Sequence, residues 1–428
     1  MMDRGRGGGS PVSSLPVGKQ RWGADGCAAP SKGEVVKCLP FSSNILSTTI
    51  ASLDLDSAGT KNCLIATTAD RRLHILSLSF PPVLYASHAA LSDAPILSCT
   101  ALSTRILLCT TMSGTLLAIT PEGQVLDKRK DHSKYVVACA IFRPSGRSQE
   151  QTTLVATAGW DNKVLIYRPS PSDDNFTLND PIATIPLQTK PEALLFLTHP
   201  DTAAPILLLS RTDSSFLVYY TFPSLPSTSP ELLGKQNLAP HSNAWVAFTP
   251  SSLALHPTDP TLLAVATNSI PHMKVLVVRL LVPPLTPDPA LLSRPSLLDD
   301  PAAPPRETQA SQARLALAVA DREHAAITLH ANTLAPQTAY STPCVAWRPD
   351  GSGVWVNGDD GVVRAVEVGS GRGVVGLGEG SGGHEAGAKV RCLASGFVGD
   401  DGEGERGEVV VSGGFDQRLV VWRADAEA

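Results

Sequence analysis

One short unit recurs along most of this chain. An apolar run rich in small residues leads into a tight polar turn that usually carries an aspartate, and a second run rich in β-branched and aliphatic residues follows. The clearest copies span residues 64–76, 154–167 and 409–422. Small residues before the aspartate let two strands close tightly, and β-branched residues after it fit a pleated surface. The unit therefore predicts a β-hairpin.

Looser copies of the hairpin fill the intervals, at 105–119, 206–220, 261–280, 315–330 and 354–368. The copies recur roughly every 40–50 residues, which is the period of a four-stranded propeller blade. A single blade cannot bury both of its faces, so the copies are expected to stack around a common axis. Eight hairpins favour eight blades. The copy at 315–330 lacks a clear first strand, however, so seven blades is the alternative.

Two copies carry polar residues at matching places: His384, Ser412, Asp416 and Trp422 in the last, and His132, Thr157, Asp161 and Tyr167 in the third. On these residues, and on the turns at 142–146 and 347–351, the chain from 34 to 423 resembles the WD40-repeat family. The resemblance implies an all-β propeller in which each set forms a hydrogen-bonded structural tetrad. It also implies closure of the ring by an N-terminal strand at 34–40, beside 418–422.

Several segments break the repeat. Residues 1–33 are rich in Gly, Pro and Ser and are expected to be disordered. The proline-rich stretch 281–311 is predicted to be a surface insertion of the propeller, and 399–407 an acidic, glycine-rich loop. Residues 424–428 are left as a C-terminal tail. The chain is thus predicted to hold one propeller domain.

Charge and hydropathy exclude some classes of partner. The formal net charge of −5 gives no broad attraction to nucleic acid or to anionic lipid. The suggestive basic groups are 128–130 and the pair Arg4 and Arg6. No signal-peptide pattern and no apolar run long enough to cross a membrane are present, and the eight cysteines form no C-x-x-C pair. We expect an intracellular protein, cytoplasmic or nuclear, with free thiols and no membrane contact.

The motifs for chemistry are weak. Gly371, Gly373 and Gly376 match a phosphate-loop spacing, but no helical pattern follows them, so a flexible loop is expected. The two sets of His, Asp and hydroxyl residues could be imagined as catalytic triads, yet the resemblance assigns them to blade closure. No clustered metal ligands and no cofactor motif stand out. We expect no enzyme activity, no cofactor and no metal.

The resemblance also implies that the residue before each turn aspartate lies on one face of the disc, near its central opening. These positions hold Ala69, Met112, Trp160, Thr212, Asp359 and Phe415. Large apolar side chains on rigid turns are typical interface anchors. The candidate partner-binding residues are therefore Met112, Trp160, Phe415, Asp359 and Arg71. Arg143 and Arg348 are further candidates to frame the same face.

Together these observations predict a non-catalytic scaffold that docks partner proteins or peptides on one propeller face. We expect it to act within a multi-protein complex. The alternative is a subunit of an RNA-processing or other nucleic-acid-associated complex, without direct nucleic-acid binding of its own.

Overall fold

The computed structural model describes residues 34–55, 59–79, 81–144, 153–170, 173, 175–222, 230–242, 248–285, 305–378, 383–398 and 407–424. The predictions for 1–33, for 399–406 and for 425–428 fall outside these residues. So do residues 286–304 of the predicted insertion and the pair Arg4 and Arg6.

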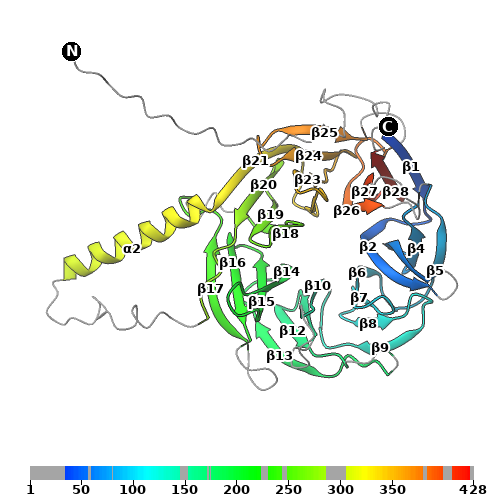
Figure 1. Ribbon diagram of the computed structural model, residues 1–428, viewed down its shortest axis with the longest axis horizontal. Helices are drawn as coiled ribbons and strands as arrows, with labels where there is room; N and C mark the ends of the chain where they lie inside the picture. Colours follow the sequence, from blue (N-terminus) through cyan, green and yellow to red (C-terminus); the bar gives the residue numbers. More distant parts are fainter. Residues whose placement is uncertain are drawn as a thin grey trace, which may run out of the picture.

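Seven antiparallel sheets of four strands lie around a common centre, so the fold is a seven-bladed β-propeller (Figure 1). From inner to outer strand, blade 1 consists of β2 (Ile45–Leu55), β3 (Gly59–Thr68), β4 (Leu73–Ser77) and β5 (Leu84–His88). Blade 2 consists of β6 (Ile96–Ala101), β7 (Leu107–Thr111), β8 (Leu116–Ile119) and β9 (Val125–Arg129). Blade 3 consists of β10 (Val136–Phe142), β11 (Leu154–Gly159), β12 (Lys163–Tyr167) and β13 (Pro181–Pro186).

Blades 4 to 6 follow the same order. Blade 4 consists of β14 (Pro191–Thr198), β15 (Pro205–Arg211), β16 (Phe216–Thr221) and β17 (Glu231–Asn237). Blade 5 consists of β18 (Pro250–Leu255), β19 (Leu262–Thr267), β20 (His272–Arg279) and β21 (Ile327–Pro336). Blade 6 consists of β22 (Val345–Trp347), β23 (Gly353–Val356), β24 (Val363–Glu367) and β25 (Gly373–Leu377). Blade 7 has the order β26 (Val390–Val398), β27 (Gly407–Gly414), β28 (Arg418–Ala424) and β1 (Glu34–Pro40).

The N-terminal strand closes the ring, as predicted. β1 pairs antiparallel with β28 over its whole length, from Glu34 opposite Ala424 to Pro40 opposite Arg418. The first and last strands of the domain therefore share one sheet, and β28 has no free edge.

The core lies between the blades. Seven clusters of buried apolar side chains each combine residues from two neighbouring blades, and together they connect every adjacent pair around the ring. Polar ties are added in places. Arg348, after β22, forms an ion pair at 2.9 Å with Glu408 of β27, and Trp355 Nε1 donates to the same buried carboxylate at 3.0 Å. This pair joins blades 6 and 7.

The predicted eighth hairpin, at 315–330, is wrong. Most of that stretch belongs to the helix α2 (Pro305–Ala325), and the rest begins β21, the outer strand of blade 5. Figure 1 shows α2 projecting away from the disc. The stretch is rich in alanine and leucine, which favour helix, and Asp321 lies within the helix rather than in a turn. Seven blades is the correct alternative.

The glycine pattern at 371–376 is also not a loop throughout. Gly371 ends the turn after β24, with a φ of 68°, whereas Gly373 and Gly376 belong to the outer strand β25. Gly376 pairs with Arg364 of β24. No phosphate-binding strand–loop–helix unit is formed by these residues.

Candidate protein-interaction face

The turns between the second and third strands of the blades all open toward the same end of the disc, because every blade repeats one strand order. We call this end, with the connections that lead into the inner strands, the turn face. Its turns are held by backbone hydrogen bonds. Each of the six positions predicted to precede the turn aspartate donates its N–H to a carbonyl that lies before the inner strand of its own blade, with N···O distances of 2.8–3.1 Å (Ala69, Met112, Trp160, Thr212, Asp359 and Phe415). The turn face is therefore rigidly framed.

In blade 7 the structure brings together three of the predicted tetrad residues. His384 Nδ1 lies 3.0 Å from both carboxylate oxygens of Asp416, and its Nε2 lies 2.6 Å from Ser412 Oγ. A carboxylate only accepts, so Nδ1 donates to Asp416, and Nε2 shares a hydrogen bond with the Ser412 hydroxyl. Trp422 packs beside His384, with 6.2 Å between ring centres.

In blade 3 the same arrangement recurs. His132 Nδ1 is 2.9 Å from Asp161 Oδ1, and Nε2 is 2.9 Å from Thr157 Oγ1. The Tyr167 hydroxyl donates to Asp131 at 3.2 Å. Burial alone raises the pKa of Asp161, but the hydrogen bonds from His132 and from the Ser133 backbone N–H outweigh it, so the pKa of this carboxyl is lowered.

Blades 1 and 2 have related locks without a histidine in the preceding connection, although in blade 1 His74 Nε2 of β4 lies 3.3 Å from Thr68 Oγ1. Asp70 accepts hydrogen bonds from Thr68 at 2.5 Å and from Ser42 at 3.0 Å. In blade 2 the polar partners exchange places, because Ser113 in the turn donates to Asp93 in the preceding connection at 3.1 Å. The sequence analysis missed Ser42 and Asp93. A carboxylate or hydroxyl upstream of a turn with the complementary group is the signal that could have found them.

Trp160 forms the centre of an aromatic stack on the turn face. Its ring stacks on Tyr135, with centroids 5.3 Å apart and planes inclined by 29°, and the ammonium of Lys190 lies 4.5 Å above it. Tyr135 is itself exposed. Trp160 is thus partly covered by a neighbouring connection, while the stack as a whole faces solvent.

Phe415 is the more open of the predicted anchors, with 42% of its surface exposed. The guanidinium of Arg391 lies 5.9 Å from the centre of its ring. Arg391 also donates to Thr342 at 2.7 Å, and burial lowers the pKa of its guanidinium. Its position is therefore fixed from two sides.

The other predicted residues differ in how free they are. Met112 is half-buried, and Arg71 is exposed. Asp359 is engaged within the protein, because Ser341 donates to it at 2.5 Å and Lys389 pairs with it at 3.1 Å. Asp359 is therefore held in place by two neighbouring side chains of the face.

Arg143 and Arg348 do not frame this face. Arg143 follows β10 and Arg348 follows β22, which places both in connections between first and second strands, at the opposite end of the disc. Arg143 donates to the backbone carbonyls of Ala101 and Leu102. Both arginines join neighbouring blades.

Besides Tyr135, two further exposed residues of the turn face were not predicted. Tyr340, in the connection before β22, has 89% of its surface exposed, and Ile270, in the blade 5 turn, is also exposed. Neither precedes a turn aspartate, so a search anchored on that residue passes over them. An isolated tyrosine within a run of Thr, Ala and Ser was the available signal.

The inner strands begin with an irregularity that brings charge to this end. In six blades the register between inner and second strand shifts immediately after the first pair, which marks a β-bulge, at Leu46, Leu97, Val137, Glu192, Ser251 and Arg391. Glu192 and Arg391 are the charged members. Burial raises the pKa of Glu192 to about 7, with Lys190 opposing this shift and Asp213 adding to it.

Comparison with known proteins supports the architecture. A family model described as UCP007778, beta-propeller domain, matches residues 42–423. The chain belongs to this family. A search of curated proteins found no match.

In this beta-propeller the two His–Asp–hydroxyl sets are poorly placed for catalysis. Ser412 and Thr157 are both fully buried, so a substrate cannot reach the hydroxyl that would act as nucleophile. Among the described residues no group of three or more His, Cys, Asp or Glu is arranged to hold a metal ion. Within the same part of the chain, no helix has both the length and the hydropathy to cross a bilayer.

The basic run at 128–130 of this propeller is partly neutralised. Arg129 forms ion pairs with Asp131 at 3.1 Å and with Asp180 at 2.6 Å. Its charge is therefore less available to phosphate groups than the sequence suggests.

Proposed function

We propose that this chain is a WD40-type propeller that acts as a non-catalytic scaffold and docks protein or peptide partners on its turn face. The observation that carries the proposal is the set of aromatic side chains presented there on fixed turns, above all Phe415 and the Tyr135–Trp160 stack. Aromatic groups on a rigid frame provide contact area at low entropic cost.

The surrounding charges suit a protein partner. Lys190 and Arg391 each lie over an aromatic ring of the face. A partner that covers these rings would also meet the two cations, which favours acidic groups next to apolar ones in the partner. The hydrogen-bonded turns give the face a fixed shape, so little ordering of this chain is needed on binding.

The alternative, a subunit of a nucleic-acid-associated complex, is compatible with the same docking face. Direct binding of nucleic acid has less support, because Arg129 is paired with two aspartates. An RNA-retention assay at low salt separates the two ideas, since strong retention by the purified protein would favour the alternative.

The scaffold proposal is tested by affinity purification of the full chain with the variants Trp160→Ala and Phe415→Ala. Tyr85→Ala is a matched control, because Tyr85 is 41% exposed, about as much as Phe415, but lies on the outer strand β5. We expect the two turn-face variants to lose partners that wild type and Tyr85→Ala retain. If both variants fold and retain every partner, the turn face is not the docking surface.

A further inference from the structure

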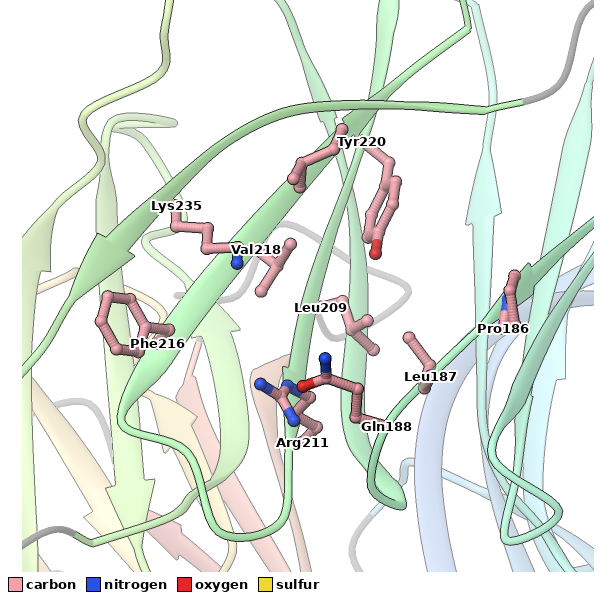
Figure 2. A pocket seen from close by; sticks show the side chains of 10 residues that line it. Pro186, Leu187, Gln188, Leu209, Arg211, Phe216, Val218, Tyr220 and Lys235 are labelled. Atoms are coloured by element: carbon pink, nitrogen blue, oxygen red, sulfur yellow. The ribbon is translucent and has the colours of Figure 1, made fainter. Parts of the chain in front are cut away.

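A groove lies between β13, the outer strand of blade 3, and the sheet surface that β15, β16 and β17 form in blade 4 (Figure 2). Its volume is about 260 Å³. That is less than the roughly 300–1,000 Å³ of pockets that enclose drug-sized ligands, so it suits one large side chain of a longer segment. It is lined by Pro186, Leu187, Gln188, Leu209, Arg211, Phe216, Val218, Tyr220, Leu232 and Lys235.

One wall of the groove is apolar because of strand periodicity. Phe216, Val218 and Tyr220 alternate along β16 and so project from the same side of the sheet. Leu232 of β17 pairs with Tyr220 and extends this wall. Further in, Leu209 packs with blade 3 in a shared core, whereas Phe216 and Leu232 remain exposed. The groove is thus the uncovered outer part of the surface that joins the two blades.

Two cations stand in the groove without an acid beside them. Lys235 pairs with Val218 in the sheet, and Arg211 ends β15. Arg211 donates to the Thr189 hydroxyl at 3.1 Å, and neither cation forms an ion pair within the described part of the chain. None of the ten lining residues is acidic. The groove therefore combines an apolar wall with uncompensated positive charge.

We propose that this groove binds a short acidic segment of a partner protein. A large apolar side chain of the segment would occupy the groove against Phe216 and Leu232, and flanking carboxylates would pair with Arg211 and Lys235. The proposal rests on the proposed scaffold function, because it supplies a second surface for a protein partner. The apolar wall and the small volume favour a peptide over a nucleic acid.

The groove borders the turn face. The connection from Leu187 to Lys190 takes part in both, because Leu187 and Gln188 line the groove and Lys190 lies over Trp160; Leu187 N–H also donates to the Asn162 carbonyl at 2.8 Å. A segment leaving the groove past Gln188 would meet the Lys190 ammonium and the Tyr135–Trp160 stack next. One partner could therefore use both surfaces.

The test uses fluorescence anisotropy with the full chain and a labelled peptide, Gly-Asp-Glu-Phe-Leu-Glu-Asp-Gly. Lys235→Glu and Arg211→Glu should each weaken binding about fivefold or more, because each replaces an attraction with a repulsion. Lys235→Gln, which removes the charge alone, should weaken it less. Lys128→Glu is the matched control: Lys128 is an exposed lysine on the outer strand β9, outside the groove, and its replacement should leave affinity unchanged.

Three outcomes would overturn the groove proposal. The first is that the Arg211 and Lys235 variants bind the peptide with unchanged affinity. The second is that a peptide with Ser in place of Phe and Leu binds with equal affinity. The third is that single-stranded RNA displaces the peptide, and that this displacement requires Arg211 and Lys235. The last would identify a nucleic-acid site. Loss of the groove proposal is distinguishable from loss of the scaffold function, because partner capture that depends on Trp160 and Phe415 would be unaffected.

Discussion

A buried carboxylate fixes the position of the turn in blade 7. Asp416 accepts from His384, and also from the backbone N–H of Glu385 at 2.9 Å and of Arg418 at 3.3 Å. Burial alone raises the pKa of Asp416, but these donors outweigh it and the pKa is lowered. The neighbouring Phe415 is presented to solvent on a turn that this carboxylate holds.

Replacing that carboxylate should destabilise the fold. Asp416→Asn removes the charged acceptor of a buried histidine, and we expect a loss of about 1–3 kcal/mol in the free energy of unfolding at pH 7. Urea denaturation at neutral pH measures it. Asp213→Asn is the control, because Asp213 is an exposed turn aspartate with no hydrogen bond or ion pair among the described residues, and a change within about 0.5 kcal/mol is expected.

The same residue predicts a pH dependence. A carboxyl whose pKa is lower in the folded than in the unfolded chain contributes its full stability above the unfolded value of about 3.9, and loses it as the pH falls through the folded value. The stability difference between wild type and Asp416→Asn should therefore shrink as the pH is lowered below about 4. A difference that stays constant from pH 7 to pH 3 would show that the pKa of Asp416 is not lowered by folding.

At the scale of elements, the hairpin pattern predicted the second and third strands of all seven blades, because tight turns and apolar runs are local features. It failed at 315–330, where an apolar run with an aspartate also fits a helix. Inner and outer strands are less regular, because register shifts interrupt their pairing in most blades, and β21 begins two residues after the end of α2. Their assignment depends on contacts with neighbouring blades, which a local pattern does not contain.

The candidate face was predictable only in part, for the same reason. The aspartate turns located Trp160 and Phe415, but whether a side chain at such a turn is free depends on residues distant in sequence. Asp359 is engaged by Ser341 and Lys389, and Trp160 is covered on one side by Tyr135. The groove beside blade 4 combines side chains from β13, β15, β16 and β17, so only the folded structure reveals it.

The helix α2 provides a test of what holds an appended element in place. Its last turn is tied to blade 4, because Glu323 accepts from the Asn237 backbone N–H at 2.7 Å. Glu323 is buried, whereas Leu317 is exposed. Glu323→Ala should increase amide hydrogen exchange along α2, while Leu317→Gln should leave it unchanged. Equal effects of the two variants would contradict this assignment of the anchor.

At the scale of the whole molecule, ring closure depends on β1. Seven interfaces between blades hold the ring, and β1 completes the sheet of the last blade over seven paired residues. Removing residues 34–40 would leave the edge of β28 unpaired. Such an edge invites pairing with other chains.

Deletion of residues 34–40 should therefore lower the melting temperature by several degrees and promote association. Calorimetry and light scattering measure both effects on a chain truncated through residue 40. A chain that lacks only residues 1–33 is the comparison protein. A truncated protein that melts like the comparison protein and stays monomeric would show that closure does not depend on this strand.

The most direct test of the docking face is site-specific photo-cross-linking. A photoreactive residue is placed at Gln417, in the blade 7 turn on the turn face, or at Ser352, in the connection between β22 and β23 at the opposite end of the disc. Both positions are exposed. We predict partner adducts from Gln417 and none from Ser352, whereas adducts from Ser352 alone would contradict the proposed docking face.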